Sequence, residues 1–310
     1  MKLSSAMVLF TRQLAANGCS VHTQGAYRRD LGALRRWIGK DQALSRITPD
    51  VLARFLISDA VLLTPDGQPR KAISVNRTKS SLRSFFAYCV EAGWIKDNPA
   101  RLIRSTPTTP REPTTLSESD SERIRKSIFA RTQFTVLRDR LIFEILLGTG
   151  MRLGLLVGLN IGDVDLDSGV LHIRTKGGGQ DKVFLPPGLQ RLLGRYLDEL
   201  APEANTAPIV PLFRSRHGTR LGARVIQLRF AQTCKVAGIL PASLKRGPAA
   251  GGSSHRISIH SLRHTFATRL YDKTGDLYLV QKALGHRQIT TTEVYARVGD
   301  ERLRRAVSVV

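Results

Sequence analysis

Apolar side chains recur at helical spacing through residues 1–104. In the first such segment they stand three or four positions apart, at Tyr27, Leu31, Leu34 and Ile38. Residues 75–90 repeat this spacing, with an apolar side made of Leu82, Phe85, Phe86 and Cys89. This part of the chain has no convincing strand pattern, apart from a weak candidate near Gly67. Residues 1–104 are therefore predicted to form a small helical bundle.

The pattern becomes mixed beyond residue 115. Two short β-like runs, Val170–Arg174 and Val183–Leu185, flank a glycine-rich loop and predict a hairpin. Helix starts and apolar helical runs are predicted at Leu116–Asp120, at 141–147 with an end at Gly148–Gly150, at 189–200, around 225–237, and from His260 to the end. Residues 116–310 are therefore predicted to be mainly helical with a small antiparallel sheet.

A proline-rich stretch separates the two patterns. Residues 105–115 contain three prolines among threonines, a composition that favours an extended and fairly stiff connector. We therefore expect a helical domain at 1–104, a linker at 105–115, and a mixed α+β domain with a C-terminal tail at 116–310.

The chain is strongly basic in both predicted domains. It has 48 Lys and Arg against 25 Asp and Glu, a net charge of +23. Residues 1–113 hold 18 basic and 8 acidic side chains, so their net charge is +10 and that of the rest is +13. Such dispersed cations favour DNA or RNA as a partner. A membrane-surface binder fits less well, because no basic amphipathic anchor or long charge run is present.

Cationic residues line one side of each predicted N-terminal helix. They are Arg28, Arg29, Arg35 and Arg36 on the first helix, and Arg77, Lys79 and Arg83 on the second. A cationic helix face is usually just exposed to solvent. Two such faces in a protein of high net positive charge favour contact with a DNA backbone.

The sequence also limits the compartment and the chemistry. Cys19, Cys89 and Cys234 are scattered, without the spacing of a zinc site or a disulfide framework. No secretory signal is present, and no apolar run approaches the roughly 18–20 residues of a membrane span. Phosphate-loop, HExxH and GxSxG motifs are absent as well. We expect a cytoplasmic protein that uses no cofactor and no metal.

Three strings rich in Arg and His lead to a tyrosine. They read GTGMRL at 148–153, IHSLRHTFAT at 259–268, and LGH at 284–286 followed nine residues later by Tyr295 in TTEVYAR. Their order and gaps resemble the three boxes of the tyrosine recombinase, or phage integrase, family. The resemblance covers residues 116–297. Residues 1–104 resemble the family's helical, SAM-like core-binding domain by their looser helical pattern.

The residue types suit phosphodiester cleavage by a side-chain nucleophile. Arg152 and Arg263 each offer a bidentate fork to phosphate oxygens. On a helix His260 would share a face with Arg263, and His286 adds a further donor. The phenol of Tyr295 can form a phosphate ester that conserves the bond energy, so that resealing needs no ATP. His264 fits the second box as a packing or capping residue.

The resemblance implies further roles. Lys176 matches the catalytic lysine that protonates the 5′ leaving oxygen, although Lys182 lies in the same hairpin and the loop is slightly longer than usual. A 3′-phosphotyrosyl intermediate is implied, and so is a tetramer that works on two double-stranded DNA sites at the nucleoid. The partner protomers would be copies of this chain or a paralogous recombinase.

Two departures from the family pattern stand out. Leu155 stands three residues after Arg152, at the position where the family commonly has an acid that supports the site. Residues 241–254 form an extra basic, glycine-rich loop, which would contact DNA or a neighbouring subunit, or be a tolerated insertion.

Two other functions stay open. A type IB topoisomerase would share the chemistry, and a catalytically weak DNA-binding relative would keep the fold. The tail at 296–310 has Leu303, Ala306 and Val307 at helical spacing, and we expect it to dock on an adjacent protomer.

Overall fold

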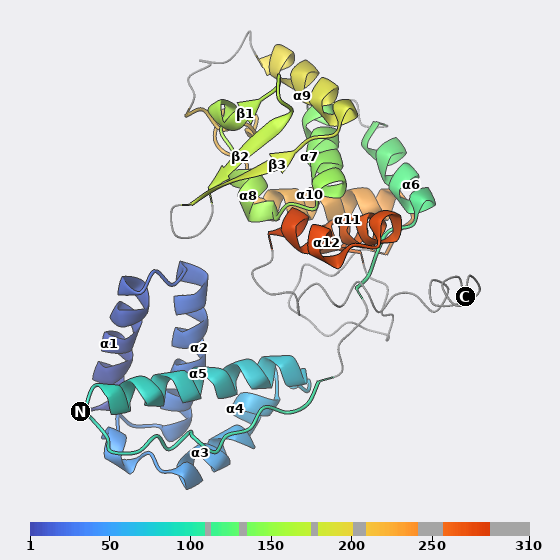
Figure 1. Cartoon of the computed structure of the whole chain (residues 1–310). Coiled ribbons are helices and arrows are strands. Elements are labelled where there is room, and N and C mark those ends of the chain that lie inside the picture. Colours follow the sequence, from blue (N-terminus) through green and yellow to red (C-terminus); the bar gives the residue numbers. More distant parts are fainter. Residues whose placement is uncertain (109–112, 130–134, 175–178, 201–208, 241–256, 286–310) are drawn as a thin grey trace, which may run out of the picture. The chain divides into compact units, whose positions relative to one another are not determined.

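The computed structural model divides the chain into two compact units, Met1–Thr109 and Pro110–Val310 (Figure 1). The structure describes residues 1–108, 113–129, 135–174, 179–200, 209–240 and 257–285. Helices dominate both units, and the second unit also contains a three-stranded antiparallel sheet. The predicted fold class is therefore confirmed.

The first unit is a bundle of short and long helices. Its helices are α1 (Leu3–Ala16), α2 (Val21–Ile38), α3 (Pro49–Leu56), α4 (Asp59–Leu62) and α5 (Ala72–Glu91), with a 3-10 turn at Leu44–Arg46. Helix α2 begins at Ser20, whose hydroxyl accepts a hydrogen bond from the amide of Thr23, and it ends at Gly39 in the left-handed conformation. The weak strand signal near Gly67 corresponds to an isolated bridge between Leu63 and Pro69.

A buried carboxylate joins the two long helices of this unit. Asp30 in α2 is only 3% exposed, and its oxygens accept hydrogen bonds from Arg77 Nη2 at 2.7 Å and Ser81 Oγ at 2.8 Å in α5. Around this polar contact the side chains of Leu34, Phe85 and other apolar residues are fully buried. The ion pair therefore fixes the register of α2 against α5 within an apolar core.

The second unit contains seven helices among the described residues. They are α6 (Glu118–Phe129), α7 (Val136–Thr149), α8 (Leu153–Gly158), α9 (Pro187–Leu200), α10 (Ala223–Val236), α11 (Ile259–Thr274) and α12 (Leu277–Leu284), with a 3-10 turn at Ile161–Asp163. The helical pattern predicted from His260 onward is confirmed as far as Leu284, where it is divided between α11 and α12, and the rest of that stretch lies outside the described residues. The chain turns at Gly275, where φ is 71°, and Asp276 then caps α12 by accepting from the amides of Tyr278 and Leu279.

The sheet has the order β1-β2-β3 and consists of β1 (Val164–Asp165), β2 (Val170–Arg174) and β3 (Gln180–Phe184). Strands β2 and β3 form the predicted hairpin, but β3 begins three residues before the predicted start and excludes Leu185. In its register Ile173 lies opposite Asp181, and His172 lies opposite Lys182. Because side chains alternate along a strand, these two pairs lie on opposite faces of the hairpin.

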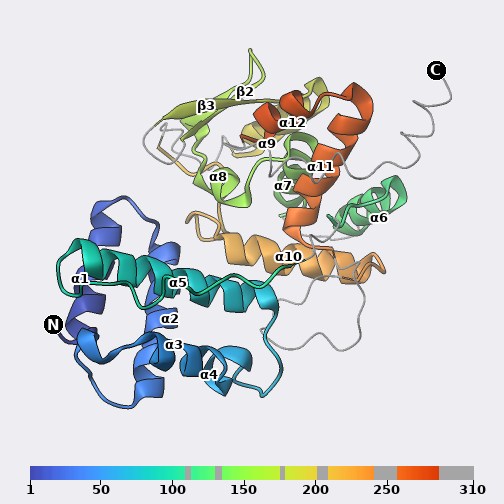
Figure 2. The ribbon, with the colours of Figure 1, turned by 60° about the horizontal axis from the view of Figure 1, so that its bottom comes forward.

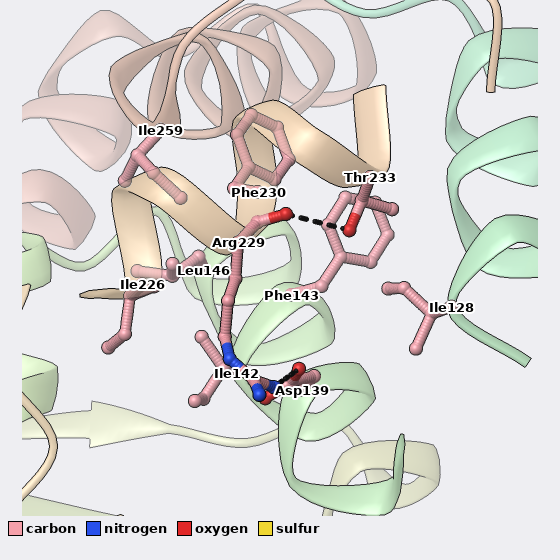
Figure 3. A pocket seen from close by; sticks show the side chains of 10 residues that line it. All are labelled: Ile128, Asp139, Ile142, Phe143, Leu146, Ile226, Arg229, Phe230, Thr233 and Ile259. Atoms are coloured by element: carbon pink, nitrogen blue, oxygen red, sulfur yellow. Dashed lines mark hydrogen bonds and ion pairs between the residues drawn. The ribbon is translucent and has the colours of Figure 1, made fainter. Parts of the chain in front are cut away.

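Helix α7 forms the centre of the second unit and packs against α6, α9 and α11 (Figure 2). Figure 3 shows Phe143 of α7 and Phe230 of α10, whose rings stack, and an ion pair between Asp139 and Arg229. The pocket lined by these side chains and by Ile142 is small, with a volume of about 30 Å³.

Among the described helices, none combines the length and the apolarity that a membrane crossing needs.

Candidate active site

The first motif string includes the turn at Gly150, which packs against α11 and α12. Helix α7 ends at Thr149, and Gly150 follows with φ of 62°. A Cβ atom on Gly150 would lie 2.9 Å from Cγ of Phe266 in α11 and 3.1 Å from Cδ2 of Leu284 in α12. Only glycine therefore fits here, both for its backbone conformation and for the space available. Arg152 follows two residues later.

Arg263 connects the three motif strings through its guanidinium group. It lies one turn into α11 and is only 8% exposed. Nη1 donates to the carbonyl of Gly150 at 2.7 Å, and Nη2 donates to the carbonyl of Leu284 at 2.8 Å. Both carbonyls belong to C-terminal ends of helices, where a cation is favoured. Leu284 also directly precedes Gly285 and His286, so that all three strings meet at Arg263.

Arg152 and His260 are exposed beside this buried arginine. Arg152 is the N-cap of α8, and His260 lies in the first turn of α11, one turn before Arg263. Ser258 and Ser261 fix that first turn through a reciprocal capping box. The structure thus brings Arg152, His260 and Arg263 to one edge of the second unit. His260 is presented to solvent, whereas Arg263 is turned inward.

Three of the predicted catalytic residues, Lys176, His286 and Tyr295, lie outside the described residues. So do the loop at 241–254 and the tail at 296–310. Lys182, the other lysine of the hairpin, is described and exposed. It lies opposite His172, on the face of the hairpin away from the buried side chain of Ile173.

His264 is half-buried beside this cluster. Burial lowers the pKa of His264, and the nearby charges of His260 and Arg263 lower it further. Both effects favour the neutral imidazole. The packing or capping role that the second motif string predicted for this residue stays a prediction.

Thr265 has a structural role that the sequence pattern did not predict. Its hydroxyl is buried, accepts from the amide of Leu116 at 2.8 Å and donates to the carbonyl of Ser261 at 2.7 Å. Residues 116 and 265 are far apart in the sequence, so no local signal could reveal this contact. It anchors the start of the second unit to α11, two positions after Arg263.

Leu155 is half-buried in α8 and packs against the apolar core of the second unit. It contributes no charge to the cationic edge. Any carboxylate that supports the arginines must therefore come from another position.

The cationic residues of the first unit fall into two groups. Arg28, Arg29, Arg35 and Arg36 on α2 are all exposed. In α5, by contrast, Arg77 pairs with Asp30, Lys79 Nζ donates to Thr106 Oγ1 at 2.9 Å, and Arg83 Nη1 donates to the carbonyl of Ile103 at 2.7 Å. Lys79 and Arg83 thus hold residues 103–106, the segment that leaves the bundle, whereas Arg77 bonds within the bundle.

A helical unit followed by a mixed unit with clustered arginines is the architecture of a DNA strand-transfer enzyme, and sequence comparison agrees. The profile of the phage integrase family matches residues 115–302, and the profile of the phage integrase N-terminal SAM-like domain matches residues 7–93. The chain belongs to the phage integrase family, the tyrosine recombinases.

Individual relatives extend over nearly the whole chain. Tyrosine recombinase XerC of Xylella fastidiosa is 33% identical over 91% of this chain and 87% of its own length. Tyrosine recombinase XerD of Proteus mirabilis is also 33% identical, over 93% of this chain and 86% of its own length. A crystal structure of the XerH site-specific recombinase, bound to palindromic difH substrate after cleavage, has a TM-score of 0.73 at 24% identity and shares the fold. That match covers 96% of this chain and 84% of XerH.

Proposed function

We propose that this protein is a site-specific DNA recombinase that cuts and rejoins DNA strands through a covalent 3′-phosphotyrosyl intermediate, without ATP or metal. The observation that carries the proposal is the position of Arg263. It holds the turn before Arg152 and the end of the helix before His286 at one place, with His260 one turn away. The two arginines supply positive charge, and the histidines supply hydrogen-bonding groups, around a phosphodiester in its transition state.

The residues would divide the work as follows. The phenol oxygen of Tyr295 attacks the phosphorus, and the bond from phosphorus to the 5′ oxygen breaks. Arg152, Arg263 and His286 donate hydrogen bonds to the non-bridging oxygens and stabilise their charge, and the imidazole of His260 accepts the phenol proton. Lys176 gives a proton to the 5′ leaving oxygen. Attack of a 5′-hydroxyl on the phosphotyrosine reverses the sequence and releases Tyr295.

The first unit would provide much of the sequence-independent affinity for double-stranded DNA. Its cations on α2 are exposed, which supports a role in phosphate contact for Arg28, Arg29, Arg35 and Arg36. Arg77, Lys79 and Arg83 add positive charge on α5. We keep residues 1–104, 105–115 and 116–310 as the proposed bundle, linker and catalytic domain.

Complete exchange between two duplexes breaks four strands, and each protomer supplies one Tyr295. A tetramer on two DNA sites, made of this chain alone or with a paralogous recombinase, therefore fits the reaction. Docking of the tail at 296–310 on an adjacent protomer would hold it together. The palindromic substrate of XerH suits protomers related by a twofold axis in the same way. Recombination by this tetramer would take place at the nucleoid, in the cytoplasm.

A covalent-capture experiment tests the proposal. The protein is incubated with a pool of nicked duplexes whose central segment is randomised, so that cleavage releases a short strand and traps the adduct. Denaturing gels should show a protein–DNA adduct with the wild type and none with Tyr295→Phe. The captured duplexes, cloned in pairs on one plasmid, should then recombine. Relaxation of supercoiled plasmid without exchange would instead identify a topoisomerase, and DNA binding without any adduct would identify a catalytically inactive relative.

A further inference from the structure

We propose that a groove lined by cations on the second unit binds an acidic, amphipathic segment of a partner protein. This cationic groove crosses α7 between α9 and α11. The inference goes beyond the proposed strand transfer and does not depend on it.

The cationic groove consists of two adjoining pockets. One lies between α7 and α9 and has a volume of about 540 Å³, and the other lies between α6, α7 and α11 and has a volume of about 300 Å³. Both are lined by Glu144, Pro186 and Leu189, so the two pockets meet at these residues. Figure 1 shows α7 between α9 and α11, and both helices pack against it. The groove is therefore large enough to take the side chains of a short protein segment.

Three helices each present one face to the cationic groove. The lining residues are spaced three or four apart over 266–273 of α11 and over 140–148 of α7, and α9 contributes residues between 188 and 195. Residues at these spacings lie on one side of a helix. The groove is thus a regular feature of the helix packing rather than an irregular gap in a loop.

The charge of the groove is strongly positive. Its charged lining residues are Arg125, Arg140, Arg191, Arg195, Arg269 and Lys273, against the single acid Glu144. Glu144 already pairs with Arg125 at 2.7 Å, and Arg269 pairs with Glu118 at 2.8 Å. Arg191, Arg195 and Lys273 are exposed, and none of the ion pairs between described residues includes them. Carboxylates of a partner would complement these three cations.

An apolar floor distinguishes this surface from a simple phosphate-binding site. Leu147 and Leu189 are buried, and Phe266 and Leu270 are partly buried. A DNA backbone brings anionic phosphates to a surface and covers little of such a floor. An amphipathic protein segment can place apolar side chains on the floor and carboxylates at the rim. Charge and floor together therefore favour a protein partner.

The chain's own tail complements the groove less well. Residues 296–310 contain four arginines against one aspartate and one glutamate, so that their side chains are positive in sum. Like charges would face each other if this tail, from a second copy, occupied the groove. We therefore assign the groove to a different, acidic protein.

The groove leads away from the edge that carries Arg152 and His260. His260 lies in the first turn of α11 and Lys273 in its last, about 20 Å apart along the helix axis. A partner held at the far end of α11 would leave the exposed edge open to DNA. It would also contact the helix that carries Arg263, and so bring a second protein to the catalytic unit during recombination.

The test measures the binding of three synthetic peptides to the full-length protein at physiological salt, where long-range attraction to a basic protein is screened. The probe is an amphipathic peptide of about 15 residues, a helix of about 22 Å, with Leu on one face and Glu on the other. One control peptide has Ser in place of every Leu, and the other is the chain's own segment 296–310. The groove variant is Arg191→Ala with Arg195→Ala. Its matched control, Arg216→Ala with Lys235→Ala, removes the same charge from exposed positions outside the groove.

The acidic amphipathic peptide should bind the wild type about five-fold or more tightly than it binds the groove variant, and the control variant should differ from the wild type by about two-fold or less. The Ser peptide should bind about five-fold or more weakly than the probe, because it leaves the apolar floor uncovered. Hydrogen exchange should show protection at the start of α9 and the end of α11 when the probe binds.

Three results would overturn the proposal. Equal binding of the Ser peptide would show attraction by charge alone, and tighter binding of the 296–310 peptide would identify a second copy as the occupant. A groove variant that loses affinity for duplex DNA but not for the probe would identify a DNA contact. Adduct formation on a nicked duplex without peptide should be the same in the groove variant and the wild type. A wild type that forms no adduct would refute the recombinase function and leave the peptide result standing.

Discussion

Arg263 Nη1 lies 2.7 Å from the carbonyl oxygen of Gly150, a residue 113 positions earlier in the chain. The bond joins α11 to the turn that presents Arg152. The same guanidinium reaches Leu284 at the end of α12. An arginine proposed to bind phosphate is thus also a structural connection between the strings that form the site.

This double role predicts different effects for the two arginines. Arg263→Lys should abolish adduct formation and also destabilise the second unit by about 3 kcal/mol, because one ammonium group cannot satisfy two buried carbonyls in the same geometry. Arg152→Lys should impair cleavage but change stability by no more than about 0.5 kcal/mol, because its side chain is exposed. Hydrogen exchange of peptides from α7 and α12 measures the difference. Equal protection in the two variants would contradict the structural role of Arg263.

Gly150→Ala should be among the most destabilising single-methyl changes in the second unit. It forces a Cβ against Phe266 and Leu284 at a φ of 62°, so a loss of about 2–4 kcal/mol is expected. Gly154→Ala is the matched control, because open space surrounds Gly154 and it lies within α8. That change should be neutral or stabilise the protein by about 0.5–1 kcal/mol. Urea denaturation followed by circular dichroism compares the two.

Asp30→Ala should destabilise the first unit by about 3 kcal/mol, because it removes a buried acceptor from Arg77 and Ser81. Asp50→Ala, which breaks an exposed pair with Arg54, should cost about 0.5 kcal/mol or less. Both tryptophans of the chain, Trp37 and Trp94, lie in the first unit. Their fluorescence during urea denaturation therefore reports this unit, and a small effect of Asp30→Ala would show that the carboxylate is dispensable.

The two groups of cations in the first unit should differ in their effect on the salt dependence of DNA binding. Replacing Arg28 and Arg35 with Ala should weaken binding for all sequences and reduce the slope of log affinity against log salt by about 1 for each phosphate that is no longer bound. Replacing Lys79 and Arg83, which hold residues 103–106, should change the slope less and the stability more. Titrations between low and moderate salt test this. Equal slopes for the two double variants would contradict it.

The three cysteines should react at very different rates. Burial raises the pKa of Cys89 and of Cys234 to about 12, so at pH 8 only about one part in ten thousand is thiolate. Cys19 is half-buried near the start of α2. A maleimide should therefore label Cys19 in minutes, and the other two only after denaturation. Rapid labelling of Cys89 in the native protein would show that the first unit opens readily.

Several features of the protein were readable from local sequence. Helices α5 and α7 and the β2–β3 hairpin follow from residue periodicity and glycine placement, because backbone preference and side-chain spacing are local properties. The motif strings around Arg152, Arg263 and Tyr295 identified the family, because phosphodiester chemistry demands these residue types and their order and spacing resemble the family's three boxes. Two-residue strand β1 and the break at Gly275 were missed, because one short pairing or one glycine leaves only a weak local signal.

Other features depend on contacts between distant residues. The residue type of Arg263 can be read from the sequence, but the carbonyls that its guanidinium holds cannot. Likewise, only packing separated the exposed arginines of α2 from Lys79 and Arg83 of α5, which bond to residues 103–106. Sequence by itself determined the family and the chemical groups of the reaction. The tertiary structure decided which of those groups face solvent and which hold the site together, because burial and hydrogen bonding are set by the folded chain as a whole.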